Sequence, residues 1–88
     1  MATNDQIIRD FAAAWSRLDA EELASYFTSD AFYHNIPMDP VAGQANIRAF
    51  LADFLREPSS INFEIRHQLA AGNLVFNERV DHSVWGGK

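Results

Sequence analysis

Two pairs of polar residues have types and a spacing suited to acid–base chemistry. Arg79 and Asp81 are two residues apart, and Tyr33 and Asn35 repeat this spacing earlier in the chain. Both pairs lie in alternating, strand-like segments, and side chains two apart on a strand project from the same face. We therefore expect a guanidinium–carboxylate contact between Arg79 and Asp81, and one pocket that all four side chains line.

Composition limits the classes of function. The 88 residues suffice for one small domain, so we expect a single domain over residues 1–88. A formal net charge of −5 with only seven Lys and Arg argues against nucleic acid as a partner, since phosphate binding needs clustered basic residues. There is no cysteine, no signal-peptide pattern and no apolar run near the about 20 residues that span a bilayer. We expect a cytoplasmic protein with no membrane partner.

Hydrophobic periodicity predicts the elements that position the four residues. A first helix capped by Thr3 or Asn4 is followed by a short one that starts at Asp19, extends over Leu23 to Phe27 and stops near residues 28–30. A short strand over 31–35 leads into a proline-containing loop that ends at Gly43, and a third helix is expected over 44–55. Two longer strands, 61–70 and 74–85, flank a turn at 71–73. Gly-Gly after the last strand is a further hairpin signal, so we expect strands beyond this chain or from a partner.

Alternation along residues 74–85 leaves the direction of Arg79 and Asp81 open. The opposite face carries four apolar residues, so periodicity alone would make that face the core. Arg79 and Asp81 would then form a solvent-facing ion pair of small energetic weight. The apolar residues on the opposite face are Leu74, Phe76, Val80 and Val84.

Three segments together resemble limonene-1,2-epoxide hydrolase, in the nuclear transport factor 2-like superfamily. They are Tyr33-His34-Asn35-Ile36-Pro37-Met38, the loop 40–43 and Asn77-Glu78-Arg79-Val80-Asp81. The likeness covers nearly the whole chain and implies a cone-shaped α+β fold. Helices would pack on a curved mixed or antiparallel sheet whose last strands are missing from this chain. The concave face would form the pocket and the outer face a homodimer interface, so the arginine and aspartate would look inward.

The resemblance implies that water opens a small apolar epoxide in one acid–base step. Asp81 would donate a proton to the epoxide oxygen, and Arg79 would bridge it to a second carboxylate, while Tyr33 and Asn35 would hold the attacking water with the base. An ordinary aspartate is ionised at neutral pH, so the acid needs apolar surroundings and a proton shared with that carboxylate. In the family the base is an aspartate on a strand beyond the hairpin, so this chain alone is expected to be inactive.

Cofactors and the lining of the pocket follow from the same resemblance. No organic cofactor or metal is implied, and His34, His67 and His82 lack a metal-ligand spacing. The substrate contacts are expected from Trp15, Phe54, Ser83 and Trp85.

Other functions remain open. A SnoaL-like cyclase would use a similar pocket and an acid on a comparable strand. A ketosteroid isomerase-like enzyme is disfavoured, because alignment from Asp30 places Asn35 where that enzyme has its base, although residues 38–41 superficially resemble its Asp-Pro-Val. A non-catalytic small-ligand-binding or dimerisation module is the third reading. An arginine-bridged acid beside a tyrosine and an asparagine favours a catalyst.

Overall fold

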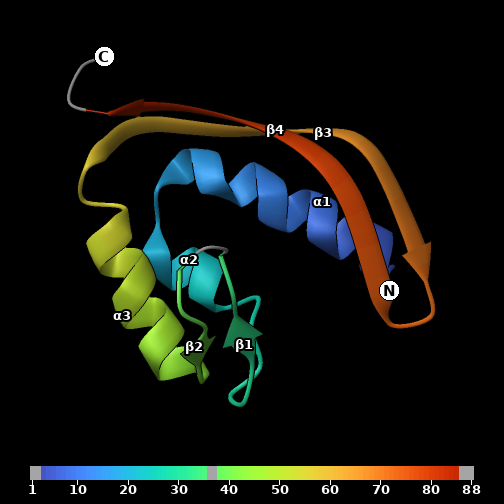
Figure 1. Ribbon diagram of the computed structural model, residues 1–88, viewed down its shortest axis with the longest axis horizontal. Coiled ribbons are helices and arrows are strands. Elements are labelled where there is room, and N and C mark those ends of the chain that lie inside the picture. The colour runs from blue at the N-terminus through green and yellow to red at the C-terminus, as the bar shows by residue number, and fades with distance from the viewer. Residues whose placement is uncertain (1–2, 36–37, 86–88) are drawn as a thin grey trace. The chain divides into compact units, whose positions relative to one another are not determined.

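The computed structural model describes residues 3–35 and 38–85, and the chain divides into two compact units (Figure 1). One unit combines Met1–Leu18 with Pro58–Lys88, and the other is Asp19–Glu57. None of the helices in the described part of the chain is long and apolar enough to cross a membrane. Each unit carries one of the two polar pairs, so each is described by itself.

The first unit begins with a capped helix. Helix α1 spans Asn4–Ala14 and continues as the 3-10 turn η1, Trp15–Arg17. The Thr3 hydroxyl accepts a hydrogen bond from the backbone N–H of Gln6 at 3.1 Å, which confirms one of the two predicted caps. The helical segment ends at Leu18, whose φ of 54° is in the left-handed region.

A long antiparallel hairpin completes this unit, with α1 along one of its faces (Figure 1). Strand β3 spans Pro58–Ala71 and strand β4 spans Leu74–Trp85. Gly72 has a φ of 58° in the two-residue loop between them, a conformation that glycine adopts without strain. Strand β4 agrees with the prediction. Strand β3 begins three residues earlier and ends one residue later than predicted, so Ala71 belongs to the strand and not to the turn. A proline is tolerated as the first residue of a strand.

A β-bulge sets which side chains share a face of the hairpin. From the turn, Ala71 pairs with Leu74, and this register continues to His67 opposite Glu78. The register then shifts by one residue between Ile65 and His67, so that Ile65 lies opposite Arg79 and Phe63 opposite Asp81. Directly opposite residues project to the same face, so Arg79 and Asp81 share a face with two apolar residues of β3.

The second unit contains two helices and a short strand pair. Helix α2 spans Ala20–Ala24, strand β1 Phe32–Tyr33, strand β2 Val41–Ala42 and helix α3 Gln44–Phe54. Asp19 caps α2 as predicted, accepting from the backbone N–H groups of residues 21 and 22 at 3.0 and 3.2 Å.

Three boundaries in this unit differ from the prediction. Helix α2 stops before Tyr26 and Phe27, because its C-cap closes at Ser25. The expected strand over 31–35 is confined to β1. Part of the expected loop is strand β2, since Val41 and Ala42 pair with Tyr33 and Phe32.

The core of the second unit lies between α2 and α3. Leu23, Ile47 and Leu51 have no exposed surface. The side-chain amide of Gln44, at the start of α3, donates to the carbonyls of Ala24 and Phe27 at 3.0 and 2.9 Å. These two bonds go to carbonyls at and just beyond the end of α2. The helices are therefore joined by apolar burial and by one polar side chain.

Candidate functional site

Arg79 and Asp81 form a two-bond ion pair on β4. The guanidinium donates from Nε to Oδ1 at 2.6 Å and from Nη2 to Oδ2 at 3.2 Å. This parallel geometry is the stronger and more directional form of an arginine–carboxylate contact. It is the contact that the spacing of the two residues predicts.

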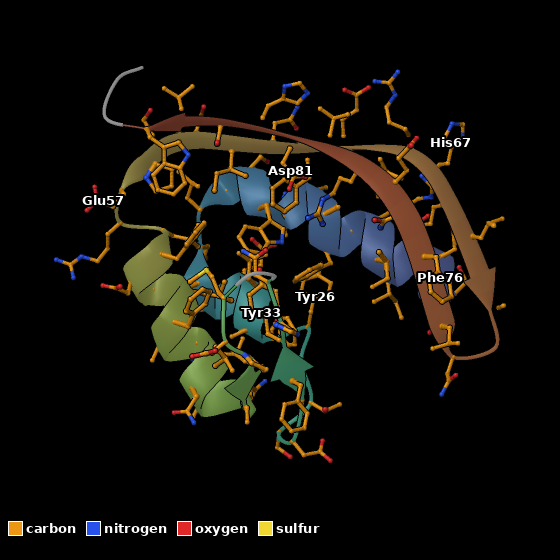
Figure 2. The ribbon with its side chains drawn as sticks, viewed as in Figure 1. Tyr26, Tyr33, Glu57, His67, Phe76 and Asp81 are labelled. Carbon is orange, nitrogen blue, oxygen red and sulfur yellow. The ribbon has the colours of Figure 1, made fainter. Side chains whose placement is uncertain are left out.

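The pair lies on the face of the hairpin that packs on α1. Figure 2 shows Asp81 on that side of the hairpin and His67 pointing away from it. The Arg79 side chain is 34% exposed and its guanidinium carbon lies 4.1 Å from the centre of the Phe63 ring. Phe63 in turn contacts Trp15 of η1, with ring centroids 4.9 Å apart. The arginine therefore points toward packed aromatic side chains and not away from the unit.

Three of the residues expected to contact substrate lie in this unit, two of them on β4 and one in its core. Ser83 and Trp85 contact each other, because the indole Nε1 of Trp85 donates to the Ser83 hydroxyl at 2.8 Å. Both follow Asp81 on the same face of β4. Trp15 is 3% exposed, so within this unit it is a core residue packed against Phe63.

A second polar network lies on the same face of the hairpin, nearer the turn. The amide of Gln68 donates to the backbone oxygen and to Oδ1 of Asp5, at 3.0 and 2.9 Å, and Asn77 donates to Gln68 at 3.1 Å. Hydrogen bonds from Gln68, and then from Arg9, hold the pKa of the Asp5 carboxyl below its usual value. These bonds fix the start of α1 against the hairpin.

Tyr33 belongs to an aromatic cluster of the second unit. Its ring lies 5.8 Å from the rings of Phe27 and Phe50, and Phe50 stacks on Phe54 at 5.9 Å. Tyr33 and Phe54, two of the residues expected to contact substrate or water, are therefore joined through Phe50. The tyrosine ring is half-buried in this cluster.

Asn35 lies outside the strand in which it was expected. Strand β1 ends at Tyr33, so strand alternation does not relate the two side chains, and that part of the prediction is wrong. Asn35 is exposed, and its backbone carbonyl accepts from the Met38 N–H at 2.7 Å.

Sequence reasoning missed Phe63 and Gln68. Both lie on β3, where alternation alone does not show which residues lie opposite Arg79 and Asp81. Counting outward from the turn would pair Asp81 with Glu64, and only the bulge brings Phe63 to that position. Over residues 3–35 and 38–85, no group of three or more histidine, aspartate or glutamate side chains could hold a metal ion.

Solved structures with the same fold come from several bacteria. An LEH-like epoxide hydrolase of M. tuberculosis superposes with a TM-score of 0.80 at 19% identity, over 94% of this chain and 62% of that one. A protein of Catenulispora acidiphila with a ketosteroid isomerase-like fold, in complex with trimethylamine, gives 0.83 at 23%, over 97% and 66%. A candidate SnoaL-like polyketide cyclase of Shewanella denitrificans gives 0.73 at 19%, over 91% and 72%. This chain spans less than two thirds of the first two, and at these identities the likeness shows a shared fold.

The family assignment rests on sequence as well as on fold. The model of the SnoaL-like domain matches residues 8–87, which include both polar pairs. The helices and antiparallel strand pairs of the two units agree with the α+β fold that the resemblance implied. The chain therefore belongs to the SnoaL-like domain family, whose members have the nuclear transport factor 2-like fold.

Proposed function

We propose that this protein is a cofactor-independent epoxide hydrolase in which Asp81 is the proton donor and Arg79 orients it. The observation that supports the proposal is the two-bond contact between these residues on the helix-covered face of the hairpin. The fold shared with the M. tuberculosis LEH-like epoxide hydrolase supports it as well.

Arg79 has the donors that a bridging role requires. Two of its five N–H groups bond to Asp81, and over the described residues no hydrogen bond is found from Nη1. A guanidinium can bind two carboxylates along different edges, because its N–H groups lie in one plane. We propose that the second edge binds the carboxylate that acts as the general base.

The proposed reaction balances without a cofactor. The base removes a proton from water while the water oxygen forms a bond to one epoxide carbon. The bond between that carbon and the ring oxygen breaks, and the ring oxygen takes the proton of Asp81. The products are a vicinal diol, an ionised Asp81 and a protonated base, and Arg79 stabilises the exchange of charge between the two carboxyls.

Diol formation from a cyclic terpene epoxide by the complete protein tests this proposal. Asp81→Asn keeps the shape of the side chain but removes the acid, so we expect turnover to fall by at least about 100-fold. Arg79→Lys retains the charge but loses the planar two-bond contact, so a similar loss is expected. Asp53→Asn, on the exposed surface of α3, is the matched control and should retain the wild-type rate.

Two results would contradict the proposal. Equal rates for the wild type and Asp81→Asn would remove Asp81 from the mechanism. If the wild type forms no diol but closes the ring of a polyketide substrate, the cyclase hypothesis is favoured. The structural neighbour from Shewanella denitrificans is the reason to test it.

The roles of Tyr33 and Asn35 as water-binding residues are part of the same proposal. Tyr33→Phe removes the hydroxyl but leaves the ring contacts with Phe27 and Phe50 intact. We expect this variant to fold normally and to lose diol formation by about tenfold or more, the size of effect associated with a lost transition-state hydrogen bond.

A further inference from the structure

We propose that Phe63 is a positioning residue, whose ring holds the Arg79 guanidinium in the orientation that meets Asp81. The effect of Phe63 on catalysis rests on the proposed function. The contact by which its ring supports the guanidinium does not depend on that function. No sequence motif assigns this phenylalanine a role, and its position follows only from the register of the hairpin.

The geometry places the Phe63 ring under the Arg79 guanidinium. Phe63 is the directly opposite partner of Asp81, and Arg79 lies opposite Ile65, one step along the same face. The Arg79 side chain therefore reaches diagonally across the hairpin, a distance that long side chains can span. Its guanidinium carbon lies 4.1 Å from the ring centre, well within the about 6 Å over which a cation is attracted to an aromatic face.

The supporting ring is itself held by packing. The Trp15 indole lies 4.9 Å from the Phe63 ring at an interplanar angle of 35°, and it is 3% exposed. Phe11 contacts this indole edge-on, with centroids 6.0 Å apart. Three aromatic residues from α1, η1 and β3 thus form a continuous support, and Phe63, its last member, contacts the arginine. A ring anchored in this way restricts the guanidinium more than a mobile surface side chain can.

This support matters because the proposed role of Arg79 is to hold two carboxylates in a fixed orientation. The ring occupies one face of the guanidinium and leaves the N–H groups free to point outward in their plane, toward carboxylates. Without the ring, the long side chain of Arg79 has more rotamers available and the two bonds to Asp81 must be formed at a greater entropic cost. Preorganised orientation of charged groups is a large part of catalysis, so losing it should lower turnover more than substrate binding.

Nuclear magnetic resonance of the complete wild-type protein gives a test that needs no activity. The ring current of Phe63 should shift the Arg79 Hε and Hδ resonances upfield. Phe63→Leu should abolish this shift, and Phe63→Tyr, which keeps the aromatic face, should retain it. Phe76→Leu is the matched control, because it makes the same change on the same hairpin at a residue that is 66% exposed on the other face.

Kinetics then test the consequence. We expect Phe63→Leu to lower kcat for diol formation about tenfold with little change in KM, and Phe63→Tyr to restore most of the loss. Wild-type Arg79 resonances at ordinary positions would overturn the support of the guanidinium, even if Phe63→Leu failed to fold. A lost shift with unchanged kcat would overturn the positioning role. If the wild type forms no diol, the proposed function fails, while the Arg79 resonances still decide whether the ring supports the guanidinium.

Discussion

At the scale of single residues, two aspartates of the first unit, Asp5 on α1 and Asp81 on β4, have different surroundings. Asp81 is bound by one guanidinium through two bonds, beside an aromatic ring. Asp5 accepts from a neutral amide and from Arg9 at the exposed start of α1. The contact of Asp81 leaves N–H donors of Arg79 that can bind another carboxylate. The contact of Asp5 with Gln68 joins helix α1 to strand β3. The proposed proton donor is therefore Asp81, whereas the contacts of Asp5 are structural.

The Asp5 contact predicts how the stability of the fold depends on pH. Because the folded-state pKa of Asp5 lies below its unfolded value, its contribution is present above pH 3.8 and is lost as the pH falls through the folded-state pKa. The urea midpoint of the wild type should therefore fall more steeply below pH 4 than that of Asp5→Asn. Gln68→Leu, which removes the main donor, should also reduce the acid dependence. Parallel curves for the wild type and Asp5→Asn would contradict this explanation.

At the scale of elements, capping hydrogen bonds stabilise the first turns of the helices, and a bulge sets the register of the two long strands. Asp19 binds two backbone N–H groups of α2, a helix of only five residues. Such a helix depends on its cap and its packing more than on propensity. In β3, the bulge between Ile65 and His67 shifts the pairing register of the two strands by one residue. Without it, Arg79 would lie opposite Arg66 and Asp81 opposite Glu64, pairing like charges, which destabilises a sheet.

The cap of α2 gives a prediction on stability. Asp19→Ala leaves two N–H groups of α2 without their acceptor and should lower the free energy of unfolding by about 0.5–2 kcal/mol. Asp19→Asn keeps a side-chain oxygen at the cap and should lose only a small part of this. Urea unfolding followed by circular dichroism measures both variants. Equal destabilisation by the two would show that the carboxylate charge matters more than the capping bond.

At the scale of the whole molecule, the outer face of the hairpin is rich in exposed apolar side chains. Leu69 is 76% exposed and lies opposite Phe76, which is 66% exposed. Leu74 and Val80 are also exposed on β4. Exposed apolar patches on soluble proteins commonly mark interfaces. The same face carries two histidine–glutamate pairs, His67 with Glu78 and His82 with Glu64. A face that holds both kinds of group can be complementary to a second copy of itself, as a two-fold symmetric interface requires.

We predict that the outer face of the hairpin forms a homodimer. Phe76→Glu introduces a charge into the centre of this apolar patch and should shift the complete protein from dimer to monomer, as measured by light scattering after size-exclusion chromatography. Phe32→Glu makes the same change at a 74% exposed position on β1 and should leave the mass unchanged. A wild-type protein that is monomeric at all concentrations would contradict the prediction.

Much of the local structure could be predicted because its causes are local. The caps at Thr3 and Asp19, helix α3 and the turn at Gly72 depend on residues within a few positions of one another. Strand β2 was missed, since Val41 and Ala42 are strand residues only through pairing with β1. The place of Asn35 was misjudged for the same reason, because the end of β1 depends on where that pairing stops.

The sequence by itself determined the presence of the helices and the long hairpin, the acidic composition, the absence of cysteine, and the arginine–aspartate spacing that forms an ion pair on one strand. Only the tertiary structure decided which face of the hairpin packs on α1 and which residue supports the arginine. Periodicity along β4 alone would place the opposite, apolar face against the core, so it points to the wrong face. The residues of β3 that share a face with Arg79 and Asp81 depend on a one-residue bulge in that other strand. That bulge places an aromatic ring in place of Glu64 opposite Asp81, and no pattern within β4 contains this information.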